Sequence, residues 1–179
     1  MKLLVLADID DIRWRGGAGQ ADALVSCGDV CDQLIVQAAE AYGCRRIFAI
    51  KGNHDLISPF PAPIYDLHLC TVVWEGIRFG GFNGSWKYKP RGPYLYGQDD
   101  ASAFLEGVPG ADVFVSHNSP RGIHDRADGI HVGFDGLVEY IHRHKPKVLV
   151  HGHQHVIAET EINGTRVIGV YGQRIIEIS

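Results

Sequence analysis

The stretch KVLVHGHQH, residues 147–155, joins a strand pattern to a group of potential metal ligands. Its apolar run at 148–150 is short and rich in valine, which is typical of a strand buried on both faces. Such a strand needs neighbouring strands and covering layers, so the stretch predicts a sheet at the centre of the fold. Three histidines follow at once: His151, His153 and His155.

Other apolar runs along the chain also end in polar residues. Four further segments have this pattern: KLLVLAD (2–8), ALVSCGD (23–29), RRIFAIKGNHD (45–55) and ADVFVSHNSP (111–120). Helical patterns alternate with them at CDQLIVQAAEAYG (31–43), GQDDASAFLEGV (97–108) and GFDGLVEYIHRHK (133–145). Alternating strands and helices predict a layered α/β fold.

Two regions break this alternation and indicate antiparallel hairpins. Residues 67–84 contain two apolar runs around Glu75-Gly76, and residues 156–179 contain Asn163-Gly164, a strong hairpin turn signal, followed by a third run. We expect these pieces to extend the sheet or to form a second sheet packed on it. Because no repeat or linker interrupts the chain, residues 1–179 are interpreted as one domain.

Composition limits the class of protein. The chain has 179 residues, 45% hydrophobic and 21% charged, with a formal net charge of −4. This charge argues against a general nucleic-acid binder, so nucleic acid is expected only as a substrate. The first apolar run is too short for a signal peptide, and no run is long enough to span a membrane. The four cysteines fit reduced thiols, and we expect a cytoplasmic protein.

The polar residues at the strand ends suggest a metal site. Ligands of open α/β sheets gather beyond the carboxyl ends of the strands. A single aspartate there is usually a cap or a turn residue, and a single histidine is usually only hydrogen-bonded. Five such strand ends together favour a cation, since clustered aspartates would otherwise repel one another. Imidazole and carboxylate ligands suit Zn, Mn, Fe or Ni better than Ca.

Five short motifs in order resemble the calcineurin-like metallophosphoesterases. They are DID (8–10), GDVCD (28–32), GNHD (52–55), SHNSP (116–120) and GHQH (152–155). The resemblance implies a four-layer α/β/β/α sandwich with mixed sheets and two divalent cations above the sheet edge. It implies Asp8 and His155 as ligands of the first cation, and Asn53, His117 and His153 as ligands of the second. Asp29 would bridge both cations, whereas His151 precedes the motif and is expected to have a strand-end role.

The same resemblance implies a phosphoesterase mechanism. Two cations about 3.5–4 Å apart can clamp a phosphoryl oxygen and lower the pKa of a shared water, so that a metal-bridging hydroxide attacks phosphorus. His54 would donate a proton to the leaving oxygen, and Asp32 would accept a hydrogen bond from His54. The other interpretations are that Asp32 caps the helix that begins beside it and that Asp55 does the same in its own loop.

The first motif departs from the family pattern, because Asp10 stands where the family has a histidine ligand. Asp10 could bind the first cation directly, bind it through a water, or leave the position empty; we favour one of the first two. With Asp8, Asp10 and Asp29, two divalent cations leave a formal charge of about +1. A hard oxygen ligand also favours Mn or Mg. We therefore predict a Mn-preferring enzyme, with Mg, Fe, Ni or Zn as other cofactors.

Two loops carry the substrate predictions. In the loop after His117, Arg121 and Asn118 are candidates for substrate binding, because a guanidinium can bind two phosphate oxygens. The loop at 84–97 mixes aromatic and basic residues, which could stack a base but more often only pack on a sheet. We expect a small phosphodiester, such as a cyclic nucleotide or a nucleotide-like molecule. The alternatives are a phosphomonoesterase or protein phosphatase, and a non-catalytic binding module; the oligomeric state stays open.

Overall fold

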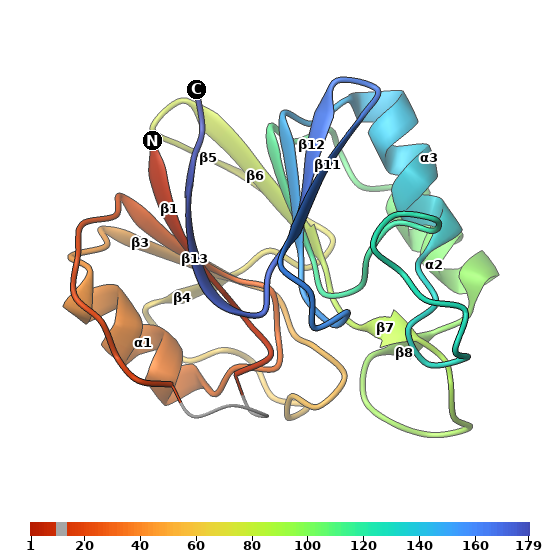
Figure 1. Ribbon diagram of the computed structural model, residues 1–179, viewed down its shortest axis with the longest axis horizontal. Helices are drawn as coiled ribbons and strands as arrows, with labels where there is room; N and C mark the ends of the chain where they lie inside the picture. Colours follow the sequence, from red (N-terminus) through yellow and green to blue (C-terminus); the bar gives the residue numbers. More distant parts are fainter. Residues whose placement is uncertain (10–13) are drawn as a thin grey trace.

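The computed structural model describes residues 1–9 and 14–179, and two sheets lie face to face at its centre (Figure 1). The first sheet has the order β13-β1-β2-β3-β4. Its strands are β1 (Lys2–Ala7), β2 (Ala23–Ser26), β3 (Arg46–Ala49), β4 (Ile64–Asp66) and β13 (Gly172–Glu177). Strands β1 to β4 are parallel, and β13 pairs with β1 in the antiparallel sense.

The second sheet has the order β11-β12-β10-β9-β6-β5. Its strands are β5 (Thr71–Trp74), β6 (Ile77–Phe82), β9 (Val113–Ser116), β10 (Val148–His151), β11 (Ala158–Ile162) and β12 (Thr165–Gly169). The four central strands are parallel, and β5 and β11 are antiparallel edges. A small pair, β7 (Ser85–Trp86) and β8 (Leu95–Tyr96), lies in the segment that was expected to be a loop.

The helices make the two outer layers. In Figure 1, α1 (Asp32–Ala41) lies against the first sheet, while α2 (Gln98–Glu106) and α3 (Asp135–His144) lie on the far side of the second. All three predicted helices are present within one or two residues of the expected ends. The predicted four-layer α/β/β/α sandwich is therefore confirmed.

Alternation along the strands explains how the layers pack. In β1, Val5 belongs to the cluster between the sheets, whereas its neighbours Leu4 and Leu6 belong to the cluster under α1. In β10, Val150 faces the other sheet, and Leu149 joins the cluster under α2 and α3. Because successive side chains point to opposite faces, a continuously apolar run fills two interfaces at once.

Both predicted hairpins are present. Their turns lie at Glu75-Gly76 and Asn163-Gly164, where all four residues have positive φ, as the type I′ hairpin turn requires. The third C-terminal run, β13, leaves this hairpin and joins the first sheet beside β1. The C-terminal segment therefore extends both sheets. Among the described residues, no helix has the length and apolar character needed to cross a membrane.

Candidate metal centre

The predicted ligands come from both sheets and converge beyond the carboxyl ends of the parallel strands. The first sheet supplies Asp8 after β1, Asp29 after β2 and Asn53 after β3. The second supplies His117 after β9 and His153 after β10. All five side chains are buried, each at most 5% exposed. Side chains this polar are rarely buried without a strong partner, so the cluster calls for a positive charge.

The distances bring the ligand atoms to one point. One ligand atom each of Asp8, Asp29 and His117 lies within 4.8 Å of the other two. Asn53 Oδ1 is 3.0 Å from His117 Nε2, and Asp29 Oδ2 is 3.3 Å from the same nitrogen. His155 Nε2 lies 3.8 Å from Asp8 Oδ1. The potential metal-ligating atoms therefore surround a small volume, with some contributed by each sheet.

The backbone at the ligands is unusual. Asp8, Asp29, His153 and His155 have φ between 51° and 63°, the left-handed region that non-glycine residues seldom adopt. Each such residue costs about 1–3 kcal/mol and persists only where the surrounding structure holds it. The left-handed geometry turns the chain sharply just after the strands. This clustering of strain marks the strand ends as a functional site.

Glycines give the ligand loops room to approach each other. A Cβ on Gly152 would lie 2.6 Å from Asp8 Oδ2 and 2.9 Å from Ala7 Cβ, and one on Gly52 would overlap the Asp29 carboxylate. The φ of Gly152 is not in the left-handed region, so a glycine is required at this position by space and not by a turn.

Protons occupy part of this cluster when no metal is bound. His117 Nδ1 is 2.8 Å from the carbonyl oxygen of Cys27, while its Nε2 faces the oxygens of Asn53 and Asp29. Burial alone would lower the pKa of His117, but the charge and hydrogen bond of Asp29 outweigh it and raise that pKa to about 9. Burial would raise the pKa of Asp29, yet His117 holds it at about 2.

This arrangement fits a divalent cation. A metal that replaces the proton on His117 Nε2 would leave the bond from Nδ1 to Cys27 intact, and such an outer contact orients a metal-bound histidine. Burial lowers the pKa of His153 well below its usual value, so this ring is already neutral. Its Nε2 lies 3.4 Å from the carbonyl oxygen of Ile130, which leaves Nδ1 as the nitrogen available to a metal.

Comparison with protein families adds an independent observation. Residues 1–170 match the model of the calcineurin-like phosphoesterase superfamily domain. The chain belongs to the calcineurin-like phosphoesterase superfamily. It is thus a metal-dependent phosphoester hydrolase by family, and the buried Asp8, Asp29 and His117 form a cluster that could hold a metal ion.

Solved structures of other proteins share the fold. The phosphopantetheinyl hydrolase of Mycobacterium tuberculosis has a TM-score of 0.60 at 13% identity, covering 94% of this chain and 89% of its own. The protein TT1561 of Thermus thermophilus has a TM-score of 0.57 at 12% identity, covering 94% and 88%. Zinc-bound Vps29 of Entamoeba histolytica has a TM-score of 0.52 at 12% identity, covering 99% and 86%. No curated protein matches the sequence.

Asp55, the last residue of the GNHD motif of this phosphoesterase, fastens two ligand loops together. Its Oδ2 accepts hydrogen bonds from the backbone N–H of Asp29 at 2.9 Å and of Gly52 at 2.7 Å. Burial raises the pKa of Asp55, partly offset by these bonds. The sequence suggested that Asp55 caps its own loop. Asp55 does accept from Gly52 in that loop, but it also accepts from Asp29, which follows a different strand.

Tyr88 also reaches the centre, a contact that no sequence pattern indicated. Asn53 Nδ2 donates to Tyr88 Oη at 3.3 Å. This bond uses the amide nitrogen of Asn53 and leaves its oxygen turned toward His117. The aromatic loop at 84–97 thus helps to orient a candidate ligand. Asn53 and Tyr88 are 35 residues apart in the sequence, so only the tertiary structure could reveal this contact.

His54 and Asp32 lie beside the centre, with a different connection from the predicted one. The backbone N–H of His54 donates to Asp29 Oδ1 at 2.8 Å, and its side chain is exposed. Asp32 accepts instead from Lys51 Nζ at 3.1 Å. Lys51 is buried and lies over the Phe60 ring, 3.7 Å from its centroid. Asp32, Lys51 and His54 line one cavity of about 430 Å³.

The two predicted substrate contacts differ in their surroundings. Asn118 is fully buried. Its side-chain amide donates to Val132 O and accepts from the N–H of Ser119 and from Gln154 Nε2. It offers no surface to a substrate, so its predicted role is corrected to one of holding the loop. Arg121 is exposed and pairs with Asp135 at 3.3 Å. The prediction for Arg121 stays open, and Asp10 lies outside the described residues.

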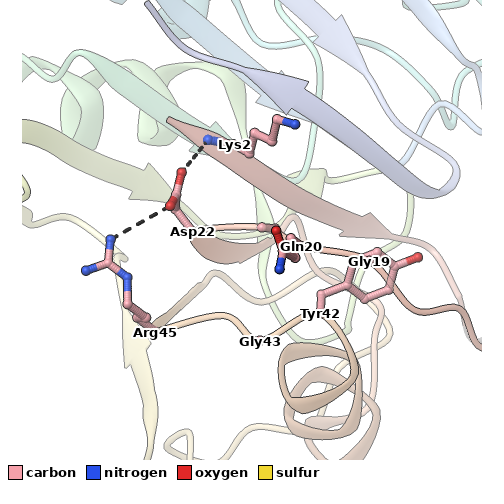
Figure 2. Close-up of a pocket in the computed structure, with 8 residues that line it drawn as sticks. Lys2, Gly19, Gln20, Asp22, Tyr42, Gly43 and Arg45 are labelled. Atoms are coloured by element: carbon pink, nitrogen blue, oxygen red, sulfur yellow. Dashed lines mark hydrogen bonds and ion pairs between the residues drawn. The ribbon is translucent and has the colours of Figure 1, made fainter.

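A second pocket lies at the opposite edge of the first sheet. Lys2, Asp22 and Arg45, drawn in Figure 2, lie at the amino ends of β1, β2 and β3. They line a cavity of about 570 Å³. The Asp22 carboxylate accepts from the N–H of Lys2 at 2.7 Å and lies 3.8 Å from an Arg45 nitrogen. Its charge is thus already satisfied. The predicted ligands lie at the other ends of these strands, so this pocket is not part of the metal centre.

Proposed function

We propose that this phosphoesterase hydrolyses small phosphodiesters with two divalent cations, Mn being preferred. The observation that carries the proposal is the convergence of Asp8, Asp29 and His117 within 4.8 Å, with Asn53 Oδ1 3.0 Å from the same histidine nitrogen. When bound, the cations would supply an acidified water for attack on phosphorus and positive charge for the phosphoryl oxygens.

The ligands divide between the two cations by their place in the cluster. Asp8 and His155 lie together at one side and would hold the first cation. Asn53, His117 and His153 would hold the second, because His117 contacts Asn53 directly and its ring lies 5.0 Å from that of His153. Asp29 has a ligand atom within 4.8 Å of those of both Asp8 and His117, so it would bridge the two cations.

His54 is the best candidate for proton donation to the leaving oxygen. Its backbone is fixed by the carboxylate of Asp29, the proposed bridging ligand, and its imidazole is exposed to solvent. Asp32 and Lys51 line the same cavity as His54. Their ion pair would contribute by shaping this cavity, which has room for the leaving group of a diester.

The preference for Mn follows from the donor set. Carboxylates and an asparagine oxygen are hard ligands, and imidazole binds most divalent transition metals. A set that mixes oxygen with histidine therefore suits Mn, whereas a site rich in thiolates would favour Zn. The described ligands contain no cysteine sulfur; the buried Cys27 contributes only its carbonyl oxygen, to His117.

The test uses metal-stripped protein to which Mn, Mg, Ni or Zn is added. Hydrolysis of bis(p-nitrophenyl) phosphate is compared with that of p-nitrophenyl phosphate. We expect Mn-dependent cleavage that favours the diester and falls about 10²–10⁴-fold in His54→Ala, the usual contribution of acid–base catalysis. His142→Ala, which removes an exposed histidine of α3, is the matched control and should retain full activity.

Three outcomes separate the proposal from its alternatives. A preference for the monoester would overturn the diester assignment. Full activity of His54→Ala would remove the proton-donor role. Absence of turnover with every metal, together with absence of metal binding, would favour a non-catalytic binding module instead.

A further inference from the structure

A histidine and aspartate pair lies against the metal centre on the loop after β9. His131 Nδ1 is 2.6 Å from Asp128 Oδ2. Asp128 Oδ1 accepts from the backbone N–H of Ile130 at 3.0 Å and of His131 at 2.8 Å. One carboxylate therefore holds both the backbone and the ring of His131. So many bonds within four residues fix the position of the imidazole.

The ring of His131 faces two proposed metal ligands. Its centroid lies 5.2 Å from that of His153 and 6.2 Å from that of His155. The loop is also tied to the GHQH motif, because Gln154 Nε2 donates to the carbonyl oxygen of His131 at 3.0 Å. The side chain of His131 is only 19% exposed. A loop residue from outside the five motifs is thus built into the wall of the centre.

The chemistry of the pair suits metal binding. A histidine that binds a metal usually donates its other ring N–H to a carboxylate, which fixes the tautomer and makes the ligating nitrogen more basic. With Nδ1 donating to Asp128, the lone pair of His131 lies on Nε2. The bonds from His131 also hold the pKa of Asp128 well below its usual range, so this carboxylate is charged.

The two proposed cation positions have unequal sets of described ligands. The second cation would have Asp29, Asn53, His117 and His153. Among the described residues, the first would have Asp8, Asp29 and His155. Asp10, expected from the sequence to bind this cation, lies outside the described residues; even with it, an octahedral Mn would have a position for a further protein ligand. The ring centroid of His131 lies 6.2 Å from that of His155, a proposed ligand of this cation, and 5.2 Å from that of His153.

We propose that His131, oriented by Asp128, is a further ligand of the cation held by Asp8 and His155. This inference rests on the proposed function, because it needs the two-cation centre. It gives the loop at 118–133 a specific role. The loop closes the metal site with an imidazole and would couple cation binding to the order of the 128–131 turn.

The test measures Mn binding to metal-stripped protein by isothermal titration calorimetry. Wild type is expected to bind two Mn ions. His131→Gln should lose at least about tenfold in affinity for one of them, with the other unchanged. Asp128→Asn, which weakens the orienting contact, should lose about 10- to 100-fold for the same ion, as outer contacts of ligands do. His142→Gln is the matched control and should bind like wild type.

A crystal structure of the Mn-loaded protein separates ligation from packing. His131 Nε2 at bonding distance from the ion beside Asp8 and His155 is the expected result. A loss of affinity without such a bond would overturn ligation and leave His131 with a packing role. Two Mn ions bound with wild-type affinity by His131→Gln would also overturn it while keeping the proposed function. If wild type itself binds no Mn, the proposed function fails first.

Discussion

At the scale of single residues, His117 combines two states that a metal centre requires. Without metal, both of its ring nitrogens face oxygen atoms, and Asp29 raises its pKa to about 9. With metal, Nε2 must be deprotonated. Nε2 of His117 therefore carries either a proton or a cation, and the number of protons released when the cation binds depends on pH.

We predict that Mn binding at pH 7 releases one proton from His117. The folded-state pKa lies above pH 7, so the ring is protonated before binding and neutral after it; above about pH 9 this release should vanish. Calorimetry in buffers of different ionisation enthalpy counts the protons. His117→Gln should release about one proton fewer than wild type at pH 7. Equal proton release by the two proteins would contradict the prediction.

At the scale of elements, a chain of histidines links the strand β10 to the loop after β9 and to β11. His151 Nδ1 donates to the carbonyl oxygen of Gly152 at 3.0 Å, and its Nε2 accepts from His124 Nδ1 at 2.9 Å. His124 Nε2 in turn lies 2.9 Å from Thr160 Oγ1. Burial lowers the pKa of His151 to about 3, so the ring is neutral. This series of hydrogen-bonded histidines stabilises the end of β10, which precedes His153.

We predict that His124→Ala destabilises the protein by about 1–3 kcal/mol, because it leaves His151 Nε2 buried without a hydrogen-bond donor. Urea unfolding measures the free energy. His124→Ala combined with His151→Leu should recover part of the loss, since an apolar pair needs no hydrogen bond. The exposed His142→Ala serves as control, within about 0.5 kcal/mol of wild type. A cost for His124→Ala no larger than this would show that the contact is unimportant.

The loop after β10 and the end of β1 fit together closely at Gly152. We predict that Gly152→Ala weakens Mn binding about tenfold, because the added Cβ would press on Asp8 Oδ2, 2.6 Å away, and overpacking typically costs about 1–3 kcal/mol. Gly107→Ala is the matched control: it lies at the end of α2, and its Cβ would have no neighbour nearer than 3.7 Å. Calorimetry with Mn compares the two, and equal affinities would argue against a tight fit.

At the scale of the whole molecule, the candidate metal centre joins the two sheets. Asp8, Asp29 and Asn53 come from the first sheet, and His117 and His153 come from the second. The inter-sheet cluster of apolar side chains holds the sheets together below this edge. A cation bound between them would act as a further link, present only in the folded protein.

We predict that saturating Mn raises the melting temperature by about 5–11 °C. At a hundred times its Kd, a ligand adds about 2.7 kcal/mol, and each kcal/mol shifts a chain of this size by about 2–4 °C. Thermal unfolding with added Mn measures the shift, and EDTA should reverse it. An unchanged melting temperature with Mn, Mg, Ni and Zn would speak against a metal that bridges the sheets.

Several features of the fold and the site were predictable because they depend on local patterns. The apolar runs indicated the central strands, Asn163-Gly164 indicated a hairpin, and the helices at 31–43, 97–108 and 133–145 followed from their spacing. The five motifs pointed to the candidate ligands Asp8, Asp29, Asn53, His117 and His153, and the structure brings their side chains together. The candidate ligands follow the strands in a fixed order along the chain, so the sequence alone reveals these residues.

Other features were decided only by the tertiary structure. The partner of Asp32 is Lys51, Asn118 is buried, and His131 lies against His153. Each contact joins loops whose paths depend on the packing of both sheets, and no local pattern encodes such a path. The sequence by itself determined the layers and the identity of the candidate metal ligands. The tertiary structure decided which side chains support them, because support depends on distances between segments far apart in the chain.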